Sequence, residues 1–136
     1  MGAPAYDPPL LGDLVGDTEV AGLFSPRAEI DRYLAFERAL AVAEAAQGVI
    51  PQAAADAIAA VAYTPDLDAI RAATARDGVP TIEFVRQLRA AVGSPHDAHV
   101  HYGATSQDVV DTALVLGLKS VLERLEGRLR VLLADL

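Results

Sequence analysis

The C-terminal part of the chain is predicted to form one long helix. No proline follows Thr105, and only Gly117 and Gly127 weaken the helix propensity of the segment that runs to the last residue. Large apolar residues recur there at alternating steps of three and four, which is the spacing of a helix-bundle seam. These residues are Val115, Leu118, Leu122, Leu125, Leu129, Leu132 and Leu136. The sequence therefore predicts a helix from Thr105 to Leu136 with a continuous apolar stripe.

This helix is longer than the domain that the rest of the chain can form. At about 1.5 Å per residue it would be a rod of about 48 Å, whereas a compact domain of 136 residues has a diameter of roughly 37 Å. One end must then extend beyond the domain and carry its apolar stripe with it. Because an uncovered stripe promotes aggregation, we expect a second chain or a continuation of this one to cover it. The pattern indicates a fragment, or a subunit that is stable only in a homo-oligomer.

Prolines and glycines divide the rest of the chain into shorter helices. Ser25 and Pro26 are typical of a helix start and Gly48 of a helix end, which predicts a helix over Pro26–Gln47. Its inward stripe should be Ile30, Leu34, Leu40 and Ala41. Further helices are expected at Pro51–Tyr63, from Thr64 and Pro65 to just before Gly78, and at Thr81–Val92. Because no segment alternates apolar and polar residues over the length of a strand, the predicted fold class is all-α.

The N-terminal segment has a different character. Met1–Gly16 is rich in proline and glycine and is expected to be an extended arm, followed by a short helical turn within Asp17–Phe24. The arm lacks the cationic region and apolar block of a signal peptide. No stretch of the chain approaches the roughly 18 consecutive apolar residues that a spanning helix needs. We expect a soluble, cytoplasmic protein that does not bind membranes.

Charge and cysteine content exclude several classes of function. The chain has 11 Lys and Arg against 19 Asp and Glu, a net charge of −8. Since the cations are scattered singly, there is no basic surface for a phosphate backbone, and nucleic acid is not an expected partner. The absence of cysteine excludes disulfides, thiolate zinc sites and a cysteine nucleophile.

All three histidines lie in one loop, Gly93–Gly103. One interpretation is a metal site, but on an extended segment His96 points away from His99 and His101, and no motif with helix-borne metal spacing is present. We therefore expect no metal. A second interpretation is a solvated loop whose histidines cap neighbouring helices. In the third, His101 faces a pocket as a proton donor or substrate ligand, because its pKa range suits either role.

The segment that follows begins the long helix and supports two interpretations. In HYGATSQD (residues 101–108), glycine and alanine precede the hydroxyl residues Thr105 and Ser106. Backbone N–H groups, hydroxyls and the positive end of the helix dipole then meet at one point, an arrangement that can bind a carboxylate or phosphate. Alternatively, Thr105 and Asp108 form a capping box that serves only the helix. Composition leaves both possibilities open.

A longer run carries a resemblance to a known family. HYGATSQDVVDTA (His101 to Ala113) resembles a signature region of the fumarase/aspartase superfamily, in the form shared by adenylosuccinate lyases and 3-carboxy-cis,cis-muconate cycloisomerases. The stretch FSPRAEIDRYLAFERALAVAEAAQGVIP (Phe24 to Pro51) is similar to the first long helix of those proteins. The resemblance covers about Leu10–Leu136 and is closest to the cycloisomerases. Adenylosuccinate lyases usually carry a histidine-aspartate pair where this chain has Pro80–Glu83, and an arginine-tyrosine pair that the arm lacks.

The resemblance implies a chain about three times longer that assembles as a homotetramer, with active sites shared among three subunits. Residues 1–104 would be an N-terminal helical domain with its arm. Residues 105–136 would be the truncated first long helix of a central bundle. The segment that holds the usual acid residue, and the mobile loop that supplies a serine base and a lysine, would lie outside this chain. Only part of the active site is therefore expected here.

The implied activity is reversible lactonisation of a tricarboxylate, 3-carboxy-cis,cis-muconate, in protocatechuate breakdown by the β-ketoadipate pathway, with no cofactor. By this resemblance His101 would hold substrate or assist proton transfer, and Thr105, Ser106 and Gln107 would bind a substrate carboxylate. Since no Lys or Arg lies between Arg89 and Lys119, we expect the cations that neutralise the substrate to come from outside this segment. Two alternatives stay open: an adenylosuccinate lyase-like enzyme that releases fumarate, and, for the isolated chain, a helical assembly module without activity.

Overall fold

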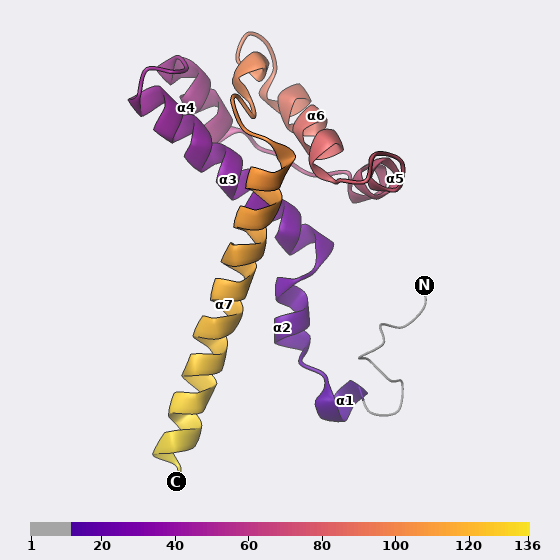
Figure 1. Ribbon diagram of the computed structural model, residues 1–136, viewed down its shortest axis with the longest axis vertical. Helices are drawn as coiled ribbons and strands as arrows, with labels where there is room; N and C mark the ends of the chain where they lie inside the picture. The colour runs from indigo at the N-terminus through magenta and orange to yellow at the C-terminus, as the bar shows by residue number, and fades with distance from the viewer. Residues whose placement is uncertain (1–11) are drawn as a thin grey trace.

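The computed structural model describes residues 12–136, and within them it contains helices and no strand (Figure 1). The helices are α1 (Gly12–Val15), α2 (Thr18–Leu23), α3 (Pro26–Ala46), α4 (Gln52–Ala60), α5 (Leu67–Asp77), α6 (Thr81–Val92), the short 3-10 helix η1 (Asp97–His99) and α7 (Ser106–Ala134). The all-α prediction is confirmed. Most of the expected arm, Met1–Gly16, lies outside the described residues. Its last part is helical rather than extended, because the Gly16 N–H donates to the Gly12 carbonyl at 2.7 Å and closes one turn.

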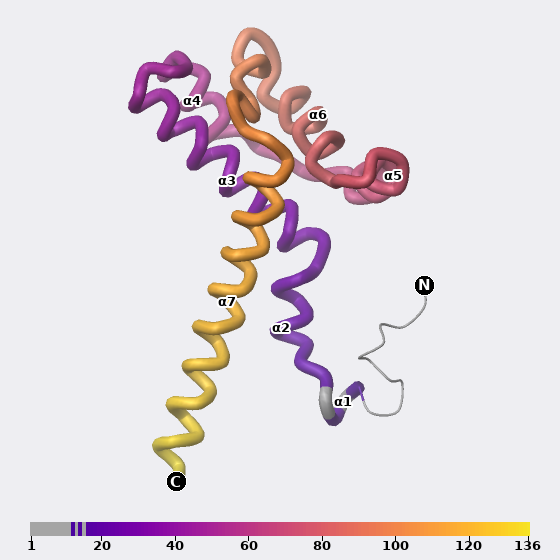
Figure 2. The backbone as a smooth tube through the Cα atoms, in the orientation of Figure 1, coloured from indigo at the N-terminus to yellow at the C-terminus, as the bar shows by residue number. Residues whose placement is uncertain are grey.

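The molecule consists of a head of packed helices and a projecting rod (Figure 1). The head contains α3, α4, α5, α6 and the loop that precedes α7, whereas α7 leaves the head and runs to the C-terminus. Figure 2 shows α2 beside the rod, so that the chain enters and leaves the head on the same side. The start of α7 packs against α3 and α6, and this places the predicted site at the head end of the rod.

The core is built around α3, which contacts both α4 and α7. Its buried positions are Ile30, Tyr33, Leu34, Glu37 and Ala41. The prediction that Leu40 faces inward was wrong, because at 100° per residue it lies roughly 80° around the helix from Ile30, and it is only partly buried. Tyr33 packs edge-on against Phe84 of α6, with ring centroids 5.4 Å apart. This contact fixes α6 beside α3.

Local sequence signals set most of the helix boundaries. Ser25 Oγ accepts from the Ala28 N–H at 3.3 Å, and Pro26 occupies the first turn of α3, as predicted. Two predicted ends were wrong. The helix expected to reach Tyr63 ends at Ala60, because Arg38 Nη2 binds the Val61 carbonyl at 2.9 Å and the Tyr63 hydroxyl binds Gln87 at 3.1 Å. The long helix ends at Ala134, two residues before the predicted end.

Gly117 lets α3 approach the rod closely. A Cβ at this position would lie 3.2 Å from the guanidinium carbon of Arg32 and 3.4 Å from the ring of Phe24. The Arg32 guanidinium is held there because its Nη1 donates to the Leu23 carbonyl at 2.7 Å. Helix propensity alone predicts that Gly117 weakens the helix. In the structure its small size allows Arg32 and Phe24 to pack against α7.

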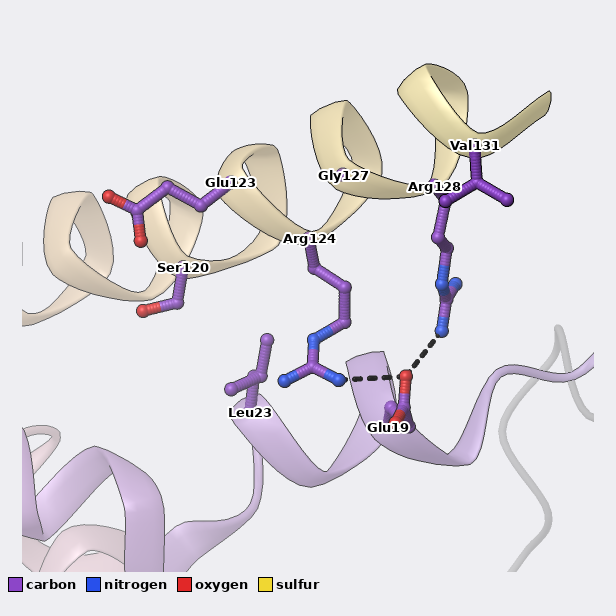
Figure 3. Close-up of a pocket in the computed structure, with 8 residues that line it drawn as sticks. All are labelled: Glu19, Leu23, Ser120, Glu123, Arg124, Gly127, Arg128 and Val131. Carbon is purple, nitrogen blue, oxygen red and sulfur yellow. Dashed lines mark hydrogen bonds and ion pairs between the residues drawn. The ribbon is translucent and has the colours of Figure 1, made fainter. Parts of the chain in front are cut away.

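Ion pairs tie α2 to the distal part of α7 (Figure 3). Arg124 lies 2.8 Å and Arg128 2.6 Å from the Glu19 carboxylate, and Arg128 also binds Asp17. Hydrogen bonding to Arg128 lowers the pKa of Asp17 to about 2, and Arg124 similarly lowers the pKa of Glu19. Glu19, Arg124 and Arg128 border a hollow of about 560 Å³ between the two helices. Because these three charged groups already pair with one another, we do not place the chemistry there.

The predicted overhang of α7 is confirmed. Leu122 is 65% exposed, Leu129 58% and Leu132 55%, so the apolar stripe beyond the head has no cover within the described part of the chain. Coverage of this stripe by another chain stays a prediction. Among residues 12–136, no helix is long and apolar enough to span a bilayer.

Candidate functional site

A cleft of about 350 Å³ lies where the histidine loop meets α6 and the first turn of α7. Its lining residues are Thr81, Ile82, Val85, Arg86, Arg89, His101 and Ser106. The helix α6 supplies five of these residues from one face, at successive spacings of one, three, one and three. Two of the four predicted site residues, His101 and Ser106, therefore line one cleft.

The buried carboxylate of Glu37 binds His101. The backbone N–H of His101 donates to Glu37 Oε2 at 3.0 Å, and its ring Nδ1 lies 2.6 Å from Glu37 Oε1. Glu37 is 1% exposed, whereas the His101 side chain retains 13% exposure. An ionised carboxylate would accept this hydrogen bond from the tautomer of the ring that carries its proton on Nδ1. In that tautomer the other ring nitrogen, Nε2, carries no proton.

The N-terminus of α7 has the capping box that the sequence indicated. Thr105 Oγ1 accepts from the Gln107 N–H at 3.2 Å, and the Thr105 N–H donates to Asp108 Oδ2 at 2.8 Å. Gln107 is exposed, and its amide binds Asp111 at 2.6 Å. Neither Thr105 nor Gln107 lines the cleft, although Ser106 between them does. Thr105 therefore caps the helix, as the second interpretation of this segment predicted. Ser106 lies in the cleft, where it could bind an anion as the first interpretation predicted.

Two arginines of α6, Arg86 and Arg89, line the cleft. Both lie outside the cation-free stretch between Arg89 and Lys119, and the expectation that the substrate-neutralising cations come from outside that stretch stays a prediction. Arg86 binds both oxygens of Glu83, at 2.7 and 2.5 Å. Arg89 Nη2 donates to the Val100 carbonyl at 3.0 Å and thereby ties α6 to the histidine loop. The sequence argument considered only the segment around the signature. The arginines precede it on a different helix, and tertiary packing brings the two together.

Glu83 and Thr81 complete the polar part of α6. Hydrogen bonds from Arg86 and then Gln87 lower the pKa of the Glu83 carboxyl to about 2. Thr81 is 1% exposed, and its Oγ1 is buried without a hydrogen-bond partner among the described residues. A buried hydroxyl without a partner costs on the order of 1–3 kcal/mol. Sequence reasoning missed all these residues, although the helical face shared by Thr81, Val85 and Arg89 was visible in the spacing.

The other two histidines do not join His101. His99 packs against Tyr102, with ring centroids 6.3 Å apart, and its Nδ1 is buried without a partner in the described residues. Glu44 lies near this loop, and burial raises its pKa, with a further contribution from Glu37. Among residues 12–136, no three His, Asp or Glu side chains gather as a metal-binding group. The three histidines therefore do not form a common metal-binding group in the described part of the chain.

Comparison with known proteins gives four likenesses. Residues 17–136 match a family model described as lyase. The chain is 41% identical over 127 residues to a 3-carboxy-cis,cis-muconate cycloisomerase of Bradyrhizobium diazoefficiens, covering 89% of this chain and 28% of the relative. It is 40% identical over 121 residues to an N-acetyl-S-(2-succino)cysteine lyase of Enterococcus italicus, covering 88% and 26%. The crystal structure of a beta-carboxy-cis,cis-muconate cycloisomerase from Acinetobacter calcoaceticus superposes with a TM-score of 0.84 at 38% identity, covering 89% and 30%. The chain spans less than a third of the length of these relatives.

Proposed function

The chain belongs to the lyase family, and on that premise we propose that it is the N-terminal part of a longer cycloisomerase that reversibly lactonises 3-carboxy-cis,cis-muconate without a cofactor. The observation that carries the proposal is the cleft, which brings His101 and Ser106 together with Arg86 and Arg89. Because the substrate carries three carboxylates, it needs both cations and hydrogen-bond donors. The similarity to the Bradyrhizobium and Acinetobacter cycloisomerases supports this choice of substrate.

In the proposed reaction, one carboxylate of the substrate adds across a double bond, and the carbon alpha to another carboxylate gains a proton. The carbanion-like species between these steps needs donors where its charge develops. Ser106 and the N-terminus of α7 would hold one carboxylate, and Arg89 another. His101 Nε2 would hold substrate or assist proton transfer. Thr105 and Gln107 adjoin this position, and Thr105 shapes the turn through its capping box.

The remaining parts of the proposal concern the whole protein. Residues 1–104 form the N-terminal domain, residues 105–136 begin a central bundle, and the enzyme works as a cytoplasmic homotetramer in protocatechuate degradation. The exposed stripe of α7 supports assembly, because each buried leucine would contribute on the order of 1.5–3 kcal/mol. The serine base and the lysine of the superfamily would come from outside these residues. The isolated chain is therefore expected to be inactive.

A second candidate is a lyase that releases an unsaturated dicarboxylate, as adenylosuccinate lyase releases fumarate. The 40% identity to the Enterococcus N-acetyl-S-(2-succino)cysteine lyase favours it, since this is close to the identity with the cycloisomerase. The same cleft could bind a dicarboxylate with Ser106 and Arg89. The two candidates differ in whether the reaction closes a ring or releases a second product.

A substrate panel distinguishes the candidates. The full-length enzyme should be assayed with 3-carboxy-cis,cis-muconate, N-acetyl-S-(2-succino)cysteine and adenylosuccinate. We expect the highest kcat/KM with the muconate, measured as loss of diene absorbance and formation of the lactone by NMR. A higher kcat/KM for either of the other two substrates would show that the enzyme is a lyase and would contradict the proposed cycloisomerase.

A further inference from the structure

We propose that Glu37 is a positioning residue that holds the imidazole of His101 in the reactive tautomer and orientation, with Nδ1–H on the carboxylate and Nε2 directed to substrate in the cleft. The inference rests on the proposed function, because it assigns a task to the site described above. Glu37 lies 64 residues before His101 in the chain, and it binds both the backbone N–H and Nδ1 of that one residue.

The placement of Glu37 is costly for stability alone. It occupies the centre of the buried face of α3, one turn from Tyr33, Leu34 and Ala41, and is 1% exposed. Burying a carboxylate costs several kcal/mol unless hydrogen bonds compensate, and an apolar residue of similar size would often stabilise such a position better. Both hydrogen bonds that Glu37 makes in the described chain go to His101. The carboxylate therefore has a task that packing does not explain.

The backbone of His101 supports the same conclusion. His101 has a φ of 59°, in the left-handed region that favours glycine, and Gly103 two residues later has a φ of 69°. A side chain at this φ costs on the order of 1–2 kcal/mol relative to glycine. The Glu37–backbone bond holds this conformation, and the Glu37–Nδ1 bond then fixes the ring. The two bonds together determine where Nε2 lies.

The charges around His101 come from several elements. Helix α3 supplies Glu37 and Glu44, α6 supplies Arg86 and Arg89 to the same cleft, and His99 lies in the same loop, whereas α7 supplies the uncharged Ser106. Only Glu37 is in hydrogen-bond contact with the ring in the described chain. A carboxylate on Nδ1 stabilises the imidazolium form and makes Nε2 more basic, as in histidines oriented by a buried aspartate. Loss of that carboxylate should remove this stabilisation.

The test uses the full-length enzyme with Glu37→Gln, Glu37→Asp, His101→Ala and the double variant Glu37→Gln/His101→Ala. The glutamine amide can donate to Nδ1 and so select the wrong tautomer. We expect Glu37→Gln to lower kcat by roughly 10²- to 10³-fold with KM changed less than about threefold, and to move the histidine limb of the pH–kcat/KM profile to lower pH. Glu37→Asp should recover part of kcat. In the His101→Ala background, Glu37→Gln should cause no further loss, because Glu37 acts through His101.

Glu29→Gln is the matched control. It removes a carboxylate from the same helix, where the Tyr33 hydroxyl binds it at 2.9 Å, and it should leave kcat and the pH profile unchanged. Thermal unfolding of every variant monitors folding. A wild-type kcat and pH profile for Glu37→Gln, with only a lower Tm, would overturn the proposal. Multiplicative losses in the double variant would overturn it as well, because Glu37 would then act independently of His101.

A spectroscopic measurement keeps the proposal testable without any substitution at Glu37. Nitrogen NMR of wild-type enzyme with labelled histidine, assigned with His101→Gln, should show His101 with the proton on Nδ1 and a low-field Nδ1 proton. The Nε2-protonated tautomer would contradict the proposal even if every Glu37 variant misfolded. This result is independent of the substrate, so failure of the cycloisomerase assay and failure of the Glu37 assignment can be told apart.

Discussion

The two ends of α7 lie in contrasting surroundings although they belong to one helix. The first turns bury Val109, Ala113 and Gly117 against the head, and Ser106 faces a cleft with charged and hydroxyl groups. Beyond Val121 the apolar residues are exposed, and ion pairs from Arg124 and Arg128 to Glu19 link that part of α7 to α2. The head end is thus organised by contacts within this chain, whereas the distal end has an apolar surface that no described residue covers.

The largest expected effect concerns the distal end. In the full-length enzyme, Leu122→Asp combined with Leu129→Asp should dissociate the homo-oligomer, because covering the two leucines is worth about 3–6 kcal/mol. Sedimentation at micromolar concentration measures the change. Leu133→Asp places the same charge on an exposed leucine outside the predicted stripe and should have a smaller effect. A wild-type protein that sediments as a stable monomer would show that the contrast between the two ends is wrong.

At the head end, Ser106→Ala and Thr105→Ala separate substrate binding from helix capping. Ser106→Ala should remove one hydrogen bond to a carboxylate, worth about 1.5–3 kcal/mol, and lower kcat/KM by roughly ten- to a hundredfold. Thr105→Ala should weaken the cap by about 1 kcal/mol, with kinetics close to wild type, since Thr105 does not line the cleft. Steady-state kinetics and thermal unfolding of both variants check this. An unchanged rate for Ser106→Ala would refute the anion-binding interpretation.

The same contrast describes what the sequence could predict. Helix starts and ends at Ser25, Gly78 and Gly93 follow from local backbone chemistry, and so does the capping box of Thr105. These features depend on neighbours within four residues. The leucine series likewise predicted the overhang, since a period along one helix requires no knowledge of its partners.

The parts that the sequence did not predict depend on packing between distant segments. Glu37 and His101 are 64 residues apart in the chain. They meet because α3 packs against the histidine loop. Arg86 and Arg89 reach the cleft because Tyr33 and Phe84 fix α6 against α3. The predicted inward stripe of α3 did not include Glu37, which is buried in the structure. A charged residue at such a position has no partner until the fold supplies one.

The smallest expected effect is on the free energy of unfolding. It concerns two carboxylates, one in the head and one beside the distal part of α7, whose pKa values are lowered to about 2. Arg86 lowers that of Glu83 in the head, and Arg128 lowers that of Asp17 beside the distal part of α7. Each folded-state pKa lies below the unfolded value, 4.5 for Glu83 and 3.8 for Asp17. Both carboxylates therefore stabilise the folded state fully above those unfolded values, and both contributions disappear as the pH falls towards 2.

Salt should separate the two carboxylates at neutral pH. Glu83 is 8% exposed and also accepts a hydrogen bond from Gln87 at 2.9 Å, whereas its partner Arg86 is 67% exposed. The loss of unfolding free energy in Glu83→Gln should therefore shrink only in part at high salt. Asp17 and Arg128 lie at the surface, where ions screen their attraction, so the difference between Asp17→Asn and wild type should shrink as salt is added. Urea unfolding at low and high salt, from neutral pH down to about the folded-state pKa values, measures both differences. Equal salt sensitivity of the two variants would mean that the head and the rod are held by electrostatic contacts of the same kind.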